Sequence, residues 1–534
     1  MKVSSTNSNK RITWFIISSV LTTMLVCIAF YIAGILGNGN DTILRGDLYV
    51  QYVSFIKDFT RNLQIGKGFT YSFSQYLGSG TMLSNAYYCI NPFNLIMLIP
   101  KVDASLAIFI IILLKISISS GCFNIFARKW LVKEDNTENN IIALIFSVFY
   151  SISGYVIILH FNLMWLDAIY VLPILIYFIL NYIHSGKCVG MIISYAYLFV
   201  TNFYMGYMVG IFSFVLFMLI GFIYPEVRNR FKNVKRFYGG YILSVIIAVM
   251  MCAVVLFPAA LYMVKNQSFD NKSFTSLSVA LLDIINSMFI GHMPSIDNKV
   301  PFLYCGIPAL LCIPLYFVGK RIDNREKKIA AILIIFLIVC CIFLPLFKAM
   351  HAFDCPDYYG FRFSFLLIFC FASMGCRTLC ISKETEASSG NVNVLLGVIW
   401  GFVLIGIYIG MIYFQTSKYS GCYLNDYEKL TVNIVFIVLW VIGILIIKSN
   451  RYLSSSKKLT RILLPALLLA VCVVEVSINN DYCLKQLGKS VSEEEYRNWT
   501  NAMEEALSQI DDSAEDFYRI RVDCDTNFNS ASFY

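Results

Sequence analysis

The sequence contains little charge and few of the residues that bind metals. Only 14% of its 534 residues are Asp, Glu, Lys or Arg, and 58% are hydrophobic. So little charge cannot give a water-soluble fold of this size a polar surface, which excludes a soluble globular protein. The four histidines and seventeen cysteines, most of the latter inside apolar runs, form no cluster with metal-ligand spacing. We therefore expect neither a metal nor another cofactor.

Motifs that bind nucleotide phosphates are missing as well. Neither GxxxxGK[S/T] nor GxGxxG occurs, which argues against an ATP-driven pump. The net charge of +9 is no evidence for nucleic-acid binding, because the Lys and Arg residues gather in short loops between apolar runs. Basic residues in such loops keep those loops on the cytoplasmic side of a membrane.

The apolar runs predict an all-α polytopic membrane protein. A membrane-spanning helix needs roughly 20 apolar residues, and we expect about thirteen such helices. The expected spans are 13–36, 103–126, 140–158, 168–183, 189–203, 208–224, 239–262, 302–319, 329–347, 363–380, 393–414, 430–447 and 462–478. With a cytoplasmic N-terminus, this alternation brings every basic cluster to the cytoplasmic side and leaves the C-terminus outside.

One connection, residues 37–102, is much longer than its neighbours in the first half of the chain and is expected to be extracytoplasmic. Its segment 47–63 carries apolar residues at helical spacing, which predicts an amphipathic helix. These residues are Leu48, Val53, Phe55, Ile56, Phe59 and Leu63. The part that follows, 71–94, is rich in Gly, Ser and Asn, which favours an irregular folded loop. We expect this connection to form an ordered cap on the membrane surface.

The last part of the chain is polar. We expect residues 1–480 to form the transmembrane domain and 481–534 to begin an extracytoplasmic C-terminal region that is truncated here. Residues 492–510 have a helical pattern, whereas 517–534 alternate like a strand. A single strand without a partner is not stable by itself.

The first candidate site is the stretch GDLYVQY, residues 46–52. Asp47 lies just past the first span, at the start of the predicted amphipathic helix, where the helix N-terminus favours a carboxylate. Partly desolvated there, it can accept a proton from a hydroxyl. Arg45 can pair with a phosphate, and we expect Gln51 and Tyr52 to contact substrate. The alternative is that Asp47 is a helix cap or an exposed loop acid.

Two further loops carry candidate substrate-binding residues. In HFNLMWLDA, His160 and Asp167 are expected to face the same outer site as Asp47. The alternative is an aromatic anchor at the membrane surface in which Asp167 caps the following helix.

In the third loop, KAMHAFDCPDYYGFR, Arg362 lies on the outer side, against the usual distribution of basic residues. Together with Lys348 and His351 it can bind a lipid phosphate or a diphosphate. The alternative is a local salt bridge of Arg362 with Asp354 or Asp357.

These segments resemble the bacterial YfhO family of membrane proteins. The resemblance is carried by GDLYVQYVSFIKDF, FSQYLGSGTMLSNAYYCINPFNLI, SVFYSISGYVIILHFNLMWLDAIYVLPI, TNFYMGYM and YYGFRFSF. It implies a glycosyltransferase of the GT-C type in the bacterial plasma membrane, which takes sugar from a polyprenyl-phosphate donor and glycosylates teichoic acids or other surface polymers. It also implies that an acid in the first loop is the catalytic base, and Asp47 occupies that place. Family members are typically longer, with a large extracytoplasmic C-terminal domain.

The favoured function is therefore sugar transfer from a polyprenyl-phosphate donor to a cell-envelope acceptor, with inversion. The first alternative, a transporter or flippase of lipid-linked sugars, predicts charges in the middle of the membrane. Lys115 and Glu475 are the nearest examples. The second alternative, a structural scaffold of the envelope, predicts no shared site among the outer loops.

Overall fold

The computed structural model describes residues 8–35, 40–66, 68–72, 79–231, 233–266, 281–292, 300–320, 322–356, 358–380, 390–414, 427–452, 460–488 and 490–509. Over these residues the chain is helical, apart from turns, loops and one short hairpin in which Tyr71 pairs with Gly80. The all-α polytopic fold expected from the apolar runs is thus confirmed.

The elements up to residue 266 are α1 (Ser8–Ile32), the π-helix η1 (Leu48–Tyr52), α2 (Val53–Gln64), β1 (Tyr71–Ser72), β2 (Ser79–Gly80), α3 (Met82–Ser84), the π-helix η2 (Asn85–Cys89), the 3-10 helix η3 (Pro92–Leu98), α4 (Ala104–Trp130), α5 (Thr137–Ser151), α6 (Gly154–Ile158), α7 (Leu166–Ser185), α8 (Val189–Thr201), α9 (Phe203–Ile223), α10 (Pro225–Asn229), α11 (Val234–Met251) and α12 (Ala253–Asn266). They are followed by α13 (Leu281–Asn286), α14 (Ile307–Val318), α15 (Asn324–Ile342), α16 (Leu344–Met350), α17 (Phe365–Leu379), α18 (Gly390–Phe414), α19 (Tyr427–Tyr452), α20 (Thr460–Gln486) and α21 (Glu493–Ser508).

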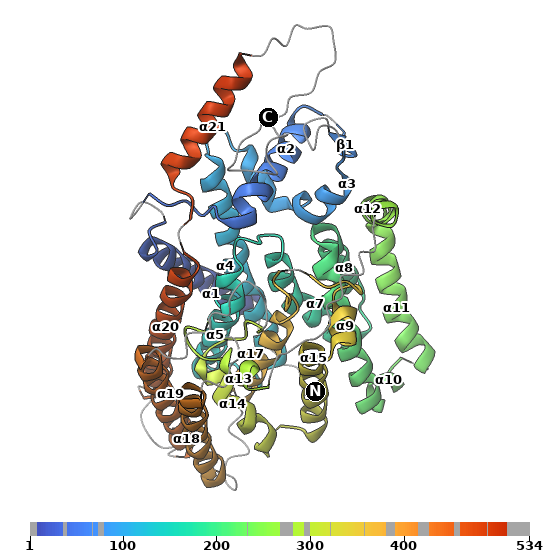
Figure 1. Cartoon of the computed structure of the whole chain (residues 1–534). Helices are drawn as coiled ribbons and strands as arrows, with labels where there is room; N and C mark the ends of the chain where they lie inside the picture. The colour runs from blue at the N-terminus through green and yellow to red at the C-terminus, as the bar shows by residue number, and fades with distance from the viewer. Residues whose placement is uncertain are drawn as a thin grey trace.

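Helix α4 is the centre of the bundle. It packs against α1, α5 and α7, while α20 returns from the far end of the sequence to pack on α5 and α6. Helix α14 packs against α17, α18 and α19. Figure 1 shows α2, α3 and β1 together at one end of the bundle and α10 at the other, with α11 along one flank.

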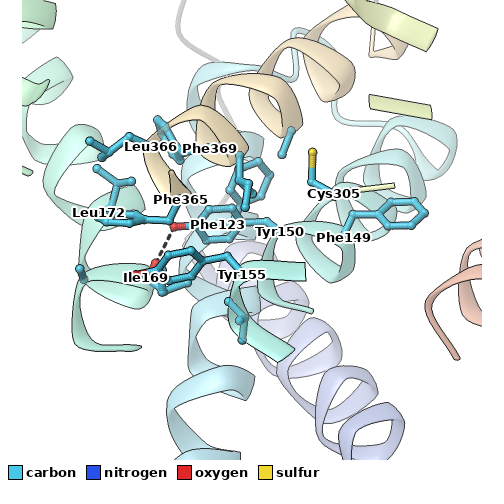
Figure 2. Close-up of a cluster of buried hydrophobic side chains, with 14 of the residues drawn as sticks. Phe123, Phe149, Tyr150, Tyr155, Ile169, Leu172, Cys305, Phe365, Leu366 and Phe369 are labelled. Atoms are coloured by element: carbon cyan, nitrogen blue, oxygen red, sulfur yellow. Dashed lines mark hydrogen bonds between the residues drawn. The ribbon is translucent and has the colours of Figure 1, made fainter. Parts of the chain in front are cut away.

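Aromatic side chains fill the core between α4, α5, α7 and α17. The ring of Phe123 stacks on that of Tyr150 with centroids 4.8 Å apart, and Phe369 meets both edge-on (Figure 2). The buried Tyr150 hydroxyl donates to the Ile169 carbonyl at 2.7 Å, so it has its hydrogen-bond partner. Truncating one such ring costs about 3–5 kcal/mol. This packing holds the helices that carry the outer loops in fixed positions.

Fewer helices than expected are long enough to cross a bilayer unaided. Among the described residues, eight are long and apolar enough, or nine if the bent pair α15 and α16 is one span. Each of the thirteen expected runs contains helix, but α8, α14 and α17 have only 13, 12 and 15 residues. At 1.5 Å per residue they are shorter than the roughly 30 Å of hydrocarbon. The count of thirteen therefore stays a prediction.

The predicted amphipathic helix of the first long loop is present as η1 followed by α2. Its inner face buries Leu48, Phe55 and Ile56. Leu63 is 39% exposed, so its assignment to the apolar face was wrong. Leu63 lies in the last turn of α2, where Arg61, Gln64 and Ile65 are exposed as well, so this end of the helix extends past the surface on which the rest of α2 packs.

The chain beyond α20 is fastened to the first loop. The Thr42 N–H donates to the Val491 carbonyl at 2.9 Å, and the Val491 N–H donates to the Leu44 carbonyl at 3.0 Å. Asp41 and Ser492 form an antiparallel bridge in the same place. We call Gly488 with residues 490–496 the strap. It leads into α21, which confirms the predicted helix, whereas the expected strand at 517–534 lies outside the described residues.

Basic side chains at the other end of the bundle are paired with acids. Arg377 binds both carboxylate oxygens of Glu326, at 2.8 and 3.2 Å, and donates to the Leu131 carbonyl at 3.2 Å. Buried Arg128 pairs with Asp135 at 3.1 Å. We call this the basic end, and the end with residues 40–102, 159–165 and 351–362 the cap end.

Candidate functional site

The three loops that carry the candidate residues meet at the cap end. The Tyr52 hydroxyl lies 3.2 Å from Asp47 Oδ2 and 3.1 Å from Asn162 Oδ1, so it joins the first loop to the second. The Tyr359 ring packs edge-on against Trp165 at 5.9 Å, which joins the third loop to the second. Residues more than 300 positions apart in the sequence thus lie together at the cap end, where they form one candidate site.

Asp47 is held at the start of η1 with its carboxylate exposed. Gly46, at φ +47°, turns the chain into this helix through the left-handed region that glycine enters without strain. The Asp47 side chain makes no capping hydrogen bond to the backbone of η1, which argues against the helix-cap alternative. Its carboxylate is instead within hydrogen-bond distance of Tyr52. Burial raises the pKa of the Tyr52 hydroxyl, so this group stays protonated and can donate.

Aromatic contacts fix Tyr52 in place. Its ring stacks on Tyr88 at 5.0 Å. The neighbouring Tyr87 accepts a hydrogen bond from Trp165 Nε1 at 3.1 Å on its hydroxyl and one from Asn202 Nδ2 at 3.2 Å on its carbonyl. These contacts tie the first loop to the second and to the turn between α8 and α9.

Arg362 is a half-buried cation without an acidic partner among the described residues. Its guanidinium lies over the ring of Trp165 at 4.9 Å and that of Tyr204 at 5.4 Å. It donates from Nε to the Tyr359 carbonyl at 3.3 Å and from Nη2 to the Tyr358 carbonyl at 3.2 Å. Stacking and carbonyl contacts orient the planar group, and no carboxylate of the described residues neutralises its charge.

The salt-bridge alternative for Arg362 is not supported at Asp354, which accepts from the following backbone N–H instead. Asp357 lies outside the described residues. The phenol of Tyr359 lies near both candidate charges. Burial raises its pKa to about 12, with a further increase from the Asp47 carboxylate and an opposing effect of Arg362. Asp47, the candidate base, and Arg362, the candidate phosphate-binding residue, therefore both influence the phenol of Tyr359.

Arg45 is directed toward the strap. Its Nη2 donates to Ser490 Oγ at 2.6 Å and to the Gly488 carbonyl at 3.3 Å. Burial lowers its pKa to about 10, partly offset by Asp41, so it remains charged at neutral pH. Gln51 is half-buried and makes no hydrogen bond to another described residue.

Asp167 and His160 are buried beneath the site. Asp167 forms an ion pair with Lys115 at 2.7 Å and accepts from Asn91 Nδ2 at 2.8 Å, so it does not cap α7. His160 Nδ1 lies 2.7 Å from the Ile157 carbonyl, and burial lowers the pKa of the imidazole to about 3. Neutral His160 therefore donates from Nδ1, and both residues support the second loop from below.

Lys348 and His351 lie on the same hairpin as Arg362. The imidazole of His351 is buried, with Nδ1 2.8 Å from the Phe347 carbonyl. Burial, together with the charge of Arg362, lowers its pKa to about 4. Lys348, in the last turn of α16, is half-buried and forms no ion pair within the described part of the chain. Nor do those residues contain a group of three or more His, Cys, Asp or Glu suited to a metal ion.

The family model for the bacterial membrane protein YfhO matches residues 18–531. The chain belongs to the YfhO family. No curated protein matches it. Because the match covers nearly the whole chain, family membership extends over the helical bundle and the strap alike.

Sequence reasoning missed several residues of this YfhO site. Tyr88, Tyr204 and Tyr359 surround Tyr52 and Arg362, but Tyr is abundant throughout the chain, so its type alone carried no signal. Ser490 lies more than 440 positions from its partner Arg45. Lys115 was recognised only as a charge inside a span, because no sequence pattern pairs it with an acid at the mouth of another span.

Proposed function

We propose that this YfhO protein transfers a sugar from a polyprenyl-phosphate donor to a cell-envelope acceptor, such as a teichoic acid, at the extracytoplasmic surface. The observation that supports this most is the joint placement of Asp47 and Arg362. An exposed carboxylate, and a guanidinium without an acidic partner among the described residues, lie on loops far apart in sequence but adjoin the same second loop. Asp47 does so through Tyr52, which reaches Asn162, and Arg362 does so through the ring of Trp165. General-base catalysis with a phosphate leaving group needs one group of each kind on opposite sides of the reacting carbon.

The chemistry follows from these two charges. The Asp47 carboxylate takes the proton of an acceptor hydroxyl as its oxygen attacks the anomeric carbon. The bond between that carbon and the phosphate oxygen breaks, and its electron pair leaves with the polyprenyl phosphate. Arg362 stabilises the charge that grows on this phosphate. Attack from the face opposite the leaving group inverts the anomeric carbon.

Arg362 suits a phosphate better than a lysine would. Its planar guanidinium presents a fork of donors that matches two phosphate oxygens, and stacking on Trp165 and Tyr204 already orients it. Lys348 adds a second positive charge on the same hairpin. His351 is neutral at physiological pH, so in this proposal it supports the loop rather than supplying charge.

The other candidate residues divide into two groups. Gln51 and Tyr52 are close enough to Asp47 to contact the acceptor, and Tyr52 also orients the base. Arg45, His160 and Asp167 are held by neighbouring groups of the protein, so we assign them to positioning of the first and second loops. The cap end is extracytoplasmic in this proposal, because the basic clusters lie at the other end.

The transporter alternative receives less support. Lys115 has the ion pair described above, and Glu475 accepts hydrogen bonds from the Tyr304 hydroxyl, the Ile307 N–H and the Trp440 indole. A buried charge needs such partners for stability, whereas a group on a transport route must also be reached by the transported molecule, and Lys115 and Glu475 are both buried.

The test is Asp47→Asn in the full-length protein, reconstituted in nanodiscs. Undecaprenyl-phosphate-linked glucose, galactose and N-acetylglucosamine serve as donors, and lipoteichoic acid serves as acceptor. Loss of a positioned general base lowers the rate by about 10²–10⁴-fold. The matched control is Asp41→Asn in the same loop, which should keep most of the activity. Near-wild-type transfer by Asp47→Asn with any donor that wild-type protein uses would refute Asp47 as the base. Absence of transfer by wild type with all three donors would count against the proposed reaction.

A further inference from the structure

The segment between α15 and α17 departs from the geometry of the other helix connections. Helix α16 bends away from α15 by 103°. Helix α15 begins in the basic end with a charged first turn, and its apolar part from Ile329 to Ile342 is about 21 Å long, so the helix crosses about two-thirds of the hydrocarbon before the bend. The 103° bend therefore directs α16 along the plane of the membrane at the cap end.

The connection after α16 holds an unusual backbone. Three of the four non-glycine residues with positive φ among the described residues lie in it, namely Ala352 at 55°, Phe353 at 67° and Tyr359 at 55°. Such conformations cost about 1–3 kcal/mol each and persist where the surroundings enforce them, often at binding sites. These backbone conformations direct the aromatic side chains of one short connection either toward the bundle or away from it. Tyr359 packs inward on Trp165, whereas Phe353 points out.

Two large aromatic side chains of this segment contact little of the protein. Phe353 is 77% exposed and Tyr358 is 57% exposed. The segment itself is anchored, because Tyr207 donates to the Ala349 carbonyl at 2.9 Å and buried His351 binds the Phe347 carbonyl. Aromatic rings that an anchored segment holds exposed are unfavourable in water, because their apolar surface stays hydrated, but favourable at a lipid surface.

The charged residues of this segment indicate how deep it lies in the membrane and which kind of lipid it can bind. Lys348 and Arg362 flank the two exposed rings in the sequence and have no acidic partner among the described residues, so each can bind an anion. The exposed carboxylate of Asp354 lies between them and would be costly in hydrocarbon. The rings therefore belong at the level of the lipid headgroups, where the cations reach the phosphate while the rings contact the first carbons of the chain.

We propose that Lys348, Phe353, Tyr358 and Arg362 form a docking surface for a long-chain lipid phosphate that approaches sideways from the outer leaflet. This deepens the proposed function and rests on it, because the lipid would be the polyprenyl-phosphate donor. Arg362 holds the phosphate next to Asp47, and Phe353 and Tyr358 hold the start of the polyprenyl chain outside the bundle. The donor thus enters without passing through the helices.

The experiment places the photoreactive amino acid p-benzoyl-phenylalanine at position 353 of the full chain, in nanodiscs of phosphatidylglycerol with added undecaprenyl phosphate. After irradiation, intact mass identifies the adducts. Undecaprenyl phosphate should be enriched among the adducts at least about tenfold over its share of the lipid. Arg362→Ala should reduce this enrichment about tenfold, because a charge-assisted contact is lost. Substitution at position 353 leaves the fold intact, since the ring there is exposed.

Three outcomes would overturn the proposal. Adducts with phosphatidylglycerol in proportion to its abundance would make this an ordinary lipid contact. A covalent dimer would make the surface an interface between two copies of the chain. No lipid adduct at position 353, although the same probe at position 402 reacts with lipid, would place the loop in water. Phe402 is 71% exposed on α18 and is the control for bilayer contact.

The result also separates this proposal from the proposed function. The adduct should persist in Asp47→Asn, which removes only the proposed base. An enriched adduct without sugar transfer in wild type would support the docking surface and count against the reaction. Transfer without the adduct would support the reaction and overturn the docking surface.

Discussion

Three arginines at the two ends of the bundle are compensated in different ways. At the basic end, Arg128 and Arg377 are buried and each is paired with a carboxylate. At the cap end, Arg362 is half-buried and is held by aromatic rings and carbonyls, and neither it nor Lys348 has an ion pair among the described residues. A buried charge is costly unless it is compensated. The difference indicates that the basic end is closed by structural ion pairs, whereas the cap end leaves positive charge available for an anionic ligand.

The largest expected effect tests the basic end. Glu326→Gln leaves Arg377 buried without its charge partner, and breaking a buried pair in this way costs about 3–5 kcal/mol. Thermal unfolding in detergent should show a clearly lowered Tm. The control is Glu226→Gln, which breaks the exposed pair with Arg325 and should lower the Tm far less, because water and salt screen an exposed pair. Equal shifts for the two variants would contradict the structural role of the buried pair.

The corresponding change at the cap end should affect binding instead of stability. Arg362→Lys keeps the positive charge but loses the planar fork. We expect the KM for the polyprenyl-phosphate donor to rise about tenfold or more, with the Tm close to that of wild type. Donor titrations with the reconstituted protein measure this. An unchanged KM together with a lowered Tm would make Arg362 a structural residue like Arg377.

Acid should destabilise the cap end through its two buried histidines, and His351 can be tested separately from His160. The pKa of His351 is lowered to about 4 by burial and by Arg362, whereas an unfolded histidine has a pKa of about 6.5. Between these values the unfolded state binds more protons, so stability is complete above pH 6.5 and falls with decreasing pH. The loss is about 1.4 kcal/mol per pH unit. His351→Asn keeps a donor for the Phe347 carbonyl and should make the fall of Tm between pH 6.5 and 4 less steep, while His160 still contributes to the fall. An unchanged slope would show that His351 does not titrate as inferred.

The smallest effect concerns the strap. Ser490→Ala removes the hydroxyl that accepts from Arg45, which should cost about 1 kcal/mol. It should also lower the transfer rate, because Arg45 precedes the turn that places Asp47. Ser490→Thr keeps the hydroxyl and should restore both properties. A loss of stability without any change in rate would confine the strap to a structural role.

The features that could be predicted from the sequence are those encoded by local patterns of residues. The apolar spacing of residues 47–63 predicted η1 and α2, and it failed only at Leu63, in the exposed last turn of α2. The place of Asp47 just past the first span, and that of Arg362 on the outer side against the usual distribution of basic residues, identified the two charges of the proposed reaction. Asp167 shows the limit of this reasoning. Its place at the mouth of a span looked like a cap or a ligand, yet it pairs with Lys115, 52 positions earlier, because only packing brings α4 beside α7.

By itself the sequence determined the membrane environment and the helical class, because the length of a hydrophobic run and the charges beside it decide locally whether a segment enters the membrane as a helix. It also determined the family, because a family model compares the chain residue by residue. Only the tertiary structure decided which polar side chains have hydrogen-bond or ion-pair partners within the protein. Arg45 donates to Ser490 of the strap, whereas Arg362 stacks on Trp165 and Tyr204 and has no acidic partner among the described residues. Ion pairs and hydrogen bonds form between side chains that are close in space, and in this chain their partners lie up to about 450 positions away.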